Sequence, residues 1–148
     1  MITKNGYFIL EQFKAYELVD RDTFQDHGEE STSFFRPEIL IALEELRTAI
    51  DKPLVINNWR EGGEYSWSGL RTIKCFIGAP YSMHRLGGAF DIKCPTMRPD
   101  RMREVIITLK KQGFLKTLTR MEAASGDNSW VHIDCKPTGK SELVVFSP

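Results

Sequence analysis

Two stretches of the chain carry hydrophobic residues at the spacing of one helix face, and they predict two strong helices. The first, 36–50, has Pro37 in its opening turn, where a missing N–H is tolerated, and Asp51-Lys52-Pro53 behind it. The second, 99–112, ends in lysines that suit the helix dipole and is followed by Gly113, a favourable C-cap. The stripes consist of Ile39, Leu43, Leu46 and Ile50, and of Met102, Val105, Ile106 and Leu109.

Residues 89–94 alternate in a way that is typical of a strand with two different faces. Ala89, Asp91 and Lys93 share one face of this strand, and the residues between them share the other. A short strand that leads into a short helix is expected within 7–19. Further strands are predicted over 54–59, 115–122, 130–135 and 142–146.

Two segments are expected to form loops. Residues 20–33 are polar and acidic, and residues 61–71 contain three glycines and two serines. No repeat or linker is visible, so we expect a single domain over 1–148. Because helices and strands do not alternate strictly, the pattern favours an α+β domain with a small, mainly antiparallel sheet and flanking helices.

Composition and charge exclude some function classes. Twenty basic residues balance twenty acidic ones, which gives no electrostatic reason to expect nucleic acid or an anionic membrane as a partner. No apolar run is long enough to span a bilayer, and the first residues lack the apolar stretch of a signal peptide, so cytosolic synthesis is expected. The wide spacing of Cys75, Cys94 and Cys135 favours buried free thiols.

Two short motifs carry the candidate chemistry. One runs from Ser82 to Asp91, and the other spans 130–134. Glycines between His84 and Asp91 allow a tight turn that brings both side chains onto one ion, and His132 comes from a second strand. Two imidazoles and one carboxylate leave a coordination position of Zn²⁺ open, which is typical of catalytic zinc. The sequence therefore predicts a metallohydrolase with one zinc ion per chain.

A hairpin that joins 118–122 to 130–134 would bring a carboxylate beside the metal ligands. With the turn centred on residue 127, Glu122 lies opposite His132, and side chains that are directly opposite on one face are in contact range. Glu122 would then act as the general base that takes the proton of the attacking water. A slip of one residue would undo this register.

Other polar residues near the motifs have alternative roles. Asp127, close to the hairpin tip, competes with Glu122 as the base. The same register places Arg120 opposite Asp134, so Asp134 is expected to orient a ligand or to pair with Arg120. Ser82 is expected to be a hydrogen-bonding loop residue, because metal-activated water needs no nucleophilic serine.

The pattern Ser-x-His-x-x-Gly-x-Ala-x-Asp at 82–91, with Trp-x-His-x-Asp at 130–134, resembles the zinc D-alanyl-D-alanine carboxypeptidases and the related phage L-alanyl-D-glutamate endopeptidases. These proteins share a small α+β fold with the hedgehog signalling domain, and the likeness runs from Ile39 to Cys135. The resemblance implies hydrolysis of an amide bond in peptidoglycan stem peptides, by terminal D-Ala release or by internal cleavage after L-Ala. The zinc ligands that it implies are His84, Asp91 and His132.

Many members of this family carry a strand that ends in a Ser-Gly-Tyr-Arg-like motif, whose arginine contacts the substrate. The matching stretch here is Asn57-Asn58-Trp59-Arg60, so Arg60 is one candidate for substrate binding, and Arg71 is the other. Trp130 is expected to pack beside the site or to line the substrate groove. We expect the unusual loop 61–80 to shape specificity.

The chain departs from the family pattern at the base. Several members place Glu or His a few residues before the last histidine ligand, where this chain has Asp127 and Ser129. A subset with a longer hairpin has Glu at the position of Glu122, and we follow that subset. The competing hypothesis is a zinc-containing binding module of the same fold that cuts no bond, which is favoured if neither Glu122 nor Asp127 lies within reach of the metal.

The expected reaction takes place at the bacterial cell wall. A chain without a signal peptide or a separate wall-binding module fits a phage lysis enzyme that a partner protein releases. It fits a phage structural component or a prophage gene equally well. We expect a monomer whose partner is peptidoglycan stem peptide.

Overall fold

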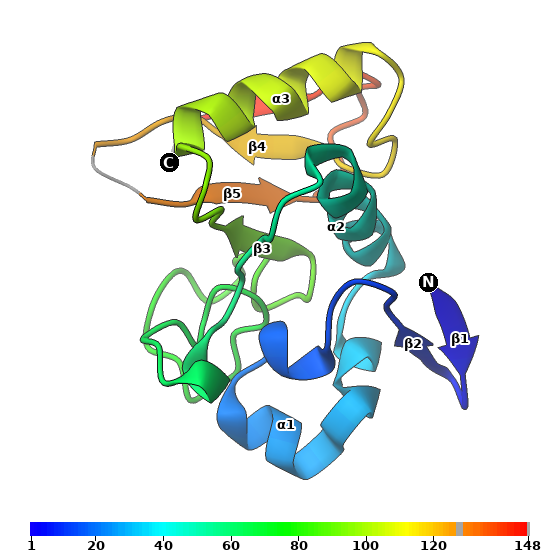
Figure 1. Cartoon of the computed structure of the whole chain (residues 1–148), viewed down its shortest axis with the longest axis vertical. Coiled ribbons are helices and arrows are strands. Elements are labelled where there is room, and N and C mark those ends of the chain that lie inside the picture. Colours follow the sequence, from blue (N-terminus) through cyan, green and yellow to red (C-terminus); the bar gives the residue numbers. More distant parts are fainter. Residues whose placement is uncertain (127–128, 148) are drawn as a thin grey trace.

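The computed structural model describes residues 1–126 and 129–147, which form an α+β domain (Figure 1). The larger sheet contains β3 (Ala89–Ile92), β5 (Val131–Asp134), β4 (Arg120–Glu122) and β6 (Val144–Phe146), in that spatial order. Its first two pairings are antiparallel, whereas β6 runs parallel to β4. The expected α+β class is therefore confirmed, and the larger sheet is mixed.

A separate antiparallel hairpin, β1 (Ile2–Lys4) and β2 (Tyr7–Ile9), lies apart from the larger sheet (Figure 1). It is followed by the 3₁₀ segment η1 (Ala15–Glu17), so the short strand and short helix that we expected here are present. No helix among the described residues is long and apolar enough to cross a membrane.

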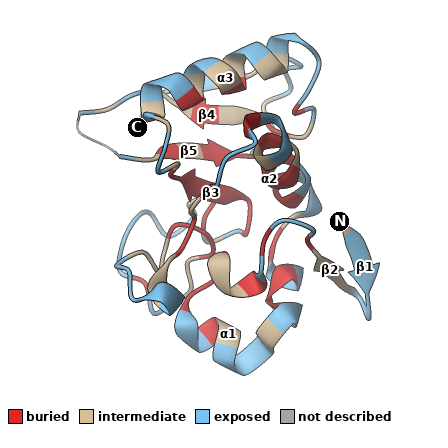
Figure 2. Cartoon of the chain, viewed as in Figure 1, coloured by how far each residue is buried: buried red, intermediate tan, exposed pale blue. Residues whose placement is uncertain are grey.

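The two strong helices are α2 (Pro37–Ile50) and α3 (Pro99–Lys111), within one residue of the predicted bounds. Each has proline in its first turn, and α2 ends where Asp51 adopts a left-handed conformation. Their apolar stripes pack with the sheet into one core, and Figure 2 shows the buried residues concentrated in β3, β5 and the inner side of α2. In α3, Met102 and Ile106 are buried, whereas Val105 and Leu109 pack at the edge of the core.

The prediction of a loop over 20–33 is wrong. This segment forms α1 (Arg21–His27) and the 3₁₀ segment η2 (Gly28–Phe34). The Asp20 carboxylate caps α1 by accepting a hydrogen bond from the Thr23 amide at 3.3 Å. Such a cap stabilises a short helix without an apolar stripe, which is why hydrophobic periodicity does not reveal it.

The prediction of a strand over 54–59 is also wrong. Val55 makes only an isolated bridge with Lys93, and residues 59–61 turn into the 3₁₀ segment η3 (Trp59–Glu61). The Asn57 and Asn58 carboxamides accept hydrogen bonds from the amides of Ser68 and Tyr65, at 2.9 and 2.8 Å. These side chains therefore tie the segment to the next loop in place of a strand ladder.

The remaining expected strands are present but shorter, with the bounds given above for β3 to β6. Cys75 and Cys135 are buried free thiols, whereas Cys94 is free but half-buried. The two faces of the larger sheet differ. Phe90, Met121 and Ile133 are buried in the core, and alternation places Asp91 and His132 on the opposite face.

We predict that Gly87→Ala destabilises the protein by roughly 2–4 kcal/mol. Gly87 has a φ of +70°, and a Cβ at this position would collide with the Phe34 carbonyl oxygen. Gly113→Ala is the matched control, because Gly113 has a φ of +90° but open space around it. Its loss should be about 1 kcal/mol. Urea unfolding measures both losses, and equal losses would show that the contact with Phe34 has no effect.

Candidate metal centre

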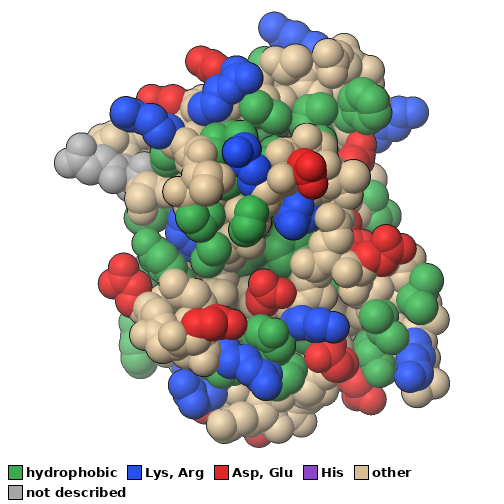
Figure 3. Space-filling model, viewed as in Figure 1, with side chains coloured by type: hydrophobic (Ala, Val, Ile, Leu, Met, Phe, Trp, Pro, Cys, Tyr) green, Lys and Arg blue, Asp and Glu red, His purple; other side chains and the backbone are tan. Residues whose placement is uncertain are grey.

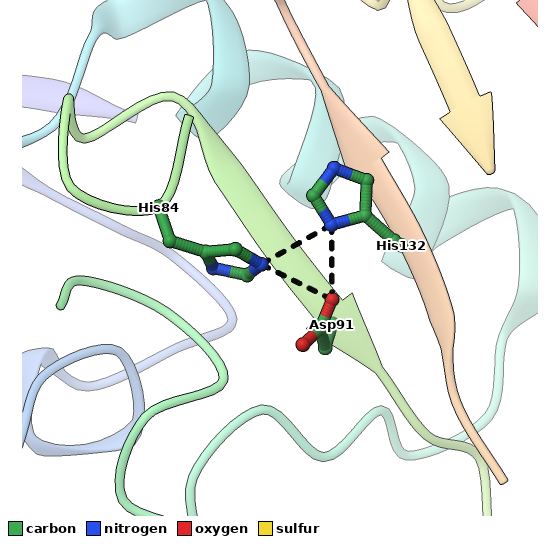
Figure 4. A group of neighbouring side chains, drawn as sticks. All are labelled: His84, Asp91 and His132. Atoms are coloured by element: carbon green, nitrogen blue, oxygen red, sulfur yellow. Dashed lines mark hydrogen bonds and ion pairs between the residues drawn. The ribbon is translucent and has the colours of Figure 1, made fainter. Parts of the chain in front are cut away.

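Three side chains from different segments point toward one another (Figure 4). His84 comes from the turn before β3, Asp91 from β3 and His132 from β5. His84 Nε2 lies 3.2 Å from Asp91 Oδ1 and 3.1 Å from His132 Nδ1, and the latter two atoms are 3.1 Å apart. The structure therefore brings together all three metal ligands that the sequence predicts.

The turn that holds His84 is built by local backbone hydrogen bonds. The Ser82 carbonyl accepts from the amides of Arg85 and Leu86, and the Met83 carbonyl accepts from the amide of Gly88 at 2.8 Å. The positive φ of Gly87 closes this turn, after which the chain enters β3. The antiparallel register then places Asp91 opposite His132.

Each imidazole uses its second ring nitrogen to contact a group that can only accept hydrogen bonds. His84 Nδ1 lies 2.9 Å from the Gly69 carbonyl oxygen, and His132 Nε2 lies 2.9 Å from Asp134 Oδ2. Each of these nitrogens therefore carries the hydrogen when its ring is neutral. The lone pairs of His84 Nε2 and His132 Nδ1 then face each other and Asp91 Oδ1. A bound cation would remove the repulsion between these lone pairs.

Arginine side chains hold both carboxylates of this region. Arg120 donates to Asp134 at 2.9 and 2.7 Å and lies over the Phe146 ring at 4.0 Å. Arg71 donates to Asp91 Oδ2 at 3.2 Å and to the Trp67 carbonyl at 2.9 Å. Asp134, which is completely buried, therefore orients His132 and pairs with Arg120 at the same time.

The geometry and the donor types fit a metal ion. His84, Asp91 and His132 could hold one ion between them. In four-coordinate zinc the ligand atoms lie about 2.1 Å from the metal and hence roughly 3.4 Å from each other. The distances of 3.1–3.2 Å within this cluster are close to that value. Two imidazoles and a carboxylate suit Zn²⁺ and, with less preference, other divalent transition metals.

The same contacts shift the pKa values of the cluster. Burial would lower the pKa of His132, but hydrogen bonds to Asp134 and Asp91 raise it to about 9. Burial would raise the pKa of Asp91, but the two histidines hold it well below its usual range. The pKa of Asp134 falls to about 2, because contacts with His132 and Arg120 outweigh its burial.

A cleft of about 190 Å³ opens beside Asp91. Two of the predicted substrate-binding residues, Arg71 and Trp130, line this cleft. The loop before His84 supplies most of the other walls. Those residues are Glu64, Tyr65, Ser66, Trp67, Ser68 and Ile77.

Glu122 ends β4 on the same face as His132. The observed pairs Arg120–Asp134 and Met121–Ile133 are those of the predicted register, which places Glu122 opposite His132 when it is continued by one residue. Glu122 is half-buried and is not among the described residues that form the cluster or line the cleft. Asp127, the competing base, lies outside the described residues.

Two further predicted site residues have other surroundings. The Arg60 guanidinium lies over the rings of Tyr16 and Phe24, at 4.2 and 5.7 Å, and it does not line the cleft. The Ser82 hydroxyl is buried and has no hydrogen-bond partner within the described part of the chain. Ser82 instead supports the turn through its backbone carbonyl.

Lys93 is a residue near the site that sequence reasoning missed. Its buried ammonium donates to the Ile56 carbonyl and the Ser68 hydroxyl, both at 2.7 Å, and lies 3.9 Å from the centre of the Tyr65 ring. Burial lowers its pKa to about 8, although nearby Asp91 opposes the shift. The signal was present, because alternation places Lys93 on the same strand face as Asp91.

Comparisons with known proteins identify no family. No protein-family model, no curated protein and no solved structure matches the chain.

We predict that Asp134→Asn lowers the affinity for Zn²⁺ by roughly 10- to 100-fold, because the variant weakens the orientation of His132. The matched control is Asp100→Asn, which removes an exposed carboxylate that pairs with Arg103 on α3. Competition with a chromogenic zinc chelator measures both affinities. Equal affinities in the two variants would remove Asp134 from the metal centre.

We also predict that the metal-free protein loses stability as the pH rises from 6.5 to 8. The pKa of His132 is raised in the folded protein. Its contribution to the free energy of unfolding is therefore complete below the ordinary histidine pKa of about 6.5 and is lost as the pH rises through about 9. Above pH 8 the lowered pKa of Lys93 has the opposite effect, because it makes the free energy of unfolding rise with pH. Zn²⁺ should reverse the trend, since it binds deprotonated ligands.

Thermal unfolding in the presence of a chelator tests this pH dependence. His132→Asn should flatten the profile between pH 6.5 and 8, whereas His27→Gln, at an exposed histidine outside the cluster, should preserve it. A flat profile for the metal-free wild-type protein contradicts the prediction.

Proposed function

We propose that the protein is a zinc-dependent peptidase that hydrolyses an amide bond in peptidoglycan stem peptides, as a D-Ala-D-Ala carboxypeptidase or an L-Ala-D-Glu endopeptidase. The observation that carries this proposal is the cluster of His84, Asp91 and His132 beside a cleft. Three protein ligands next to a cleft leave room for water and substrate, whereas structural zinc sites are closed by four ligands. The motif resemblance adds the substrate class and a fold of the hedgehog/DD-peptidase type.

The residues around the cluster support hydrolysis. A zinc ion held by these three residues would supply a Lewis acid that polarises a carbonyl and lowers the pKa of a coordinated water to about 7. Gly69 and Asp134 fix the ring orientation of the two histidines, so the ligands need little rearrangement. Arg71 lines the cleft, and its contacts with Asp91 and the Trp67 carbonyl occupy only part of its guanidinium. Arg71 is therefore a better candidate than Arg60 to bind the substrate.

Glu122 is the proposed general base. It shares the sheet face of His132, and the continued β4–β5 register places the two residues opposite each other. In this role its carboxylate takes a proton from the attacking water and returns it to the leaving amine. The amide bond breaks as the carbonyl carbon gains the water oxygen, so no further reactant is needed.

A binding module of the same fold is the second candidate. It is favoured by one observation, namely that Glu122 is not among the described residues that line the cleft. In that case the cleft would hold a wall peptide without cutting it. Both candidates bind zinc and peptide, so only the fate of the peptide bond separates them.

We predict that the zinc-loaded protein releases a product from purified peptidoglycan fragments and that a chelator abolishes it. Mass spectrometry identifies the product: loss of one alanine indicates a carboxypeptidase, and loss of a longer peptide indicates an endopeptidase. Glu122→Gln should keep the zinc content but lower kcat by roughly 100-fold or more, because it removes a general base. Glu142→Gln, at an exposed glutamate near β6, is the matched control.

The outcomes separate the candidates. Full activity of Glu122→Gln would remove Glu122 from the mechanism without affecting the metal centre. No product from zinc-loaded wild-type protein across several wall chemistries would favour the binding module.

A further inference from the structure

Large hydrophobic side chains are exposed on one loop next to the metal centre. Residues 72–82, called the apolar loop here, include Phe76 with 96% of its surface exposed, Ile73 with 93% and Tyr81 with 87%. Ten large hydrophobic residues are exposed in the described part of the chain, and more than half of them gather on or beside this loop. Those residues are Phe34, Ile73, Phe76, Ile77, Tyr81 and Leu86.

Hydrogen bonds from the Arg85 side chain to backbone carbonyls fix the conformation of the apolar loop. The Arg85 guanidinium donates to the carbonyls of Thr72, Cys75 and Ala79 at 2.9, 2.8 and 3.2 Å. The Cys75 side chain is buried beneath the loop. Because a guanidinium fixes several carbonyls at once, the loop presents its apolar side chains outward in a defined arrangement. Such a side chain leaves its apolar surface in water, so a ligand that covers it gains affinity.

The apolar loop lines a second hollow, larger than the metal cleft, which has a volume of about 1010 Å³. The α1 and η2 segments contribute Thr23, His27 and Phe34 to the same lining. This volume lies at the upper end of the range for small-ligand sites, and the lining is mainly apolar. The cavity is therefore large enough for a bulky side chain and part of its backbone.

The cavity adjoins the metal cleft. Arg71, which holds Asp91, lines both hollows, and Ile77 of the apolar loop lines the cleft together with Trp130. Gly78 lies against the same arginine, since a Cβ added there would be 2.7 Å from Arg71 Nη1. The apolar loop is thus the shared wall between cleft and cavity, and one ligand can contact both.

The charges around the loop do not suit an anionic lipid surface. Lys74, the lysine of the loop, pairs with Asp22 at 3.0 Å, and Arg85 is occupied by backbone carbonyls. Figure 3 shows basic and acidic side chains interspersed over the face of the molecule that it presents. Membrane-binding apolar surfaces normally carry unpaired lysines and arginines beside the hydrophobic residues.

We propose that the apolar loop and its cavity form a subsite for a bulky apolar side chain of a peptide whose backbone lies in the metal cleft. The inference rests on the proposed function only in taking the ligand of the cleft to be a peptide. It goes beyond that function, because the methyl groups of alanine are too small to occupy a cavity of about 1010 Å³. The peptide preferred at this subsite carries a large aliphatic or aromatic side chain next to the segment that lies in the cleft.

Peptide binding to the zinc-free protein tests the subsite without requiring hydrolysis. The probes are two fluorescein-labelled hexapeptides of equal charge, identical except that one has two phenylalanines where the other has serines. Fluorescence anisotropy should show at least about 10-fold tighter binding of the phenylalanine peptide, as expected for burial of one or two apolar side chains. Ile73→Ser and Phe76→Ser should each lose most of this preference.

Phe114→Ser is the matched control, because Phe114 is 52% exposed and lines neither hollow. All three variants alter exposed side chains, and an unchanged affinity for Zn²⁺ verifies that the cluster is intact. Equal affinity of the wild-type protein for both peptides overturns the inference, as does a preference that survives Ile73→Ser and Phe76→Ser.

Two parallel measurements separate the other occupants. Sedimentation with phosphatidylcholine and phosphatidylglycerol vesicles would assign the surface to lipid if Phe76→Ser abolishes the sedimentation. A concentration-dependent dimer in light scattering would assign the surface to a second copy of the chain if Phe76→Ser abolishes the dimer. Either result without a peptide preference overturns the inference. If loop-dependent peptide binding is found but no hydrolysis occurs, the subsite stands and the peptidase proposal fails.

Discussion

The pairing of β3 with β5 is the constraint on which the candidate site depends. It sets Asp91 opposite His132, and the alternate residues Phe90 and Ile133 are completely buried in the core. A slip of either strand by one residue would turn its buried side chain, Phe90 or Ile133, to the polar face and would turn its candidate ligand, Asp91 or His132, into the core. The hydrophobic effect therefore fixes the register, and the register fixes the distance between a carboxylate and an imidazole. His84 needs only the short turn closed by Gly87 to join them.

The electrostatics of the site follow from how its carboxylates are paired. Asp91 contacts Arg71 and Asp134 contacts Arg120, so the fixed charges of these four side chains cancel. A divalent cation in the cluster would then keep much of its positive charge and would favour an anionic or strongly polarised oxygen ligand. The surroundings of the cluster thus favour chemistry that develops negative charge on oxygen, which is what amide hydrolysis requires.

Sequence reasoning succeeded where a periodic pattern and a buried face constrain each other. The stripes of 36–50 and 99–112 predicted α2 and α3, and a hairpin with its turn centred on residue 127 predicted the β4–β5 register. It failed where side chains bond locally to the backbone, as Asp20 does at α1 and as Asn57 and Asn58 do in place of a strand. It left Arg60 and Arg71 undecided, because the packing of Arg60 on Tyr16 depends on contacts between distant segments that no local pattern encodes.

Arg71 connects the metal ligand, the cleft and the apolar loop through one planar group. Its Nε donates to the Trp67 carbonyl, its Nη2 donates to Asp91, and its Nη1 lies against Gly78. A guanidinium holds these directions in a fixed planar relation, whereas the donors of a lysine ammonium rotate and have no such fixed geometry. A displacement of the apolar loop at Gly78 therefore acts on the same rigid group that orients Asp91. A ligand that covered the loop would therefore stabilise the position of this arginine. Through this one side chain, the proposed subsite would affect the geometry of the candidate metal cluster.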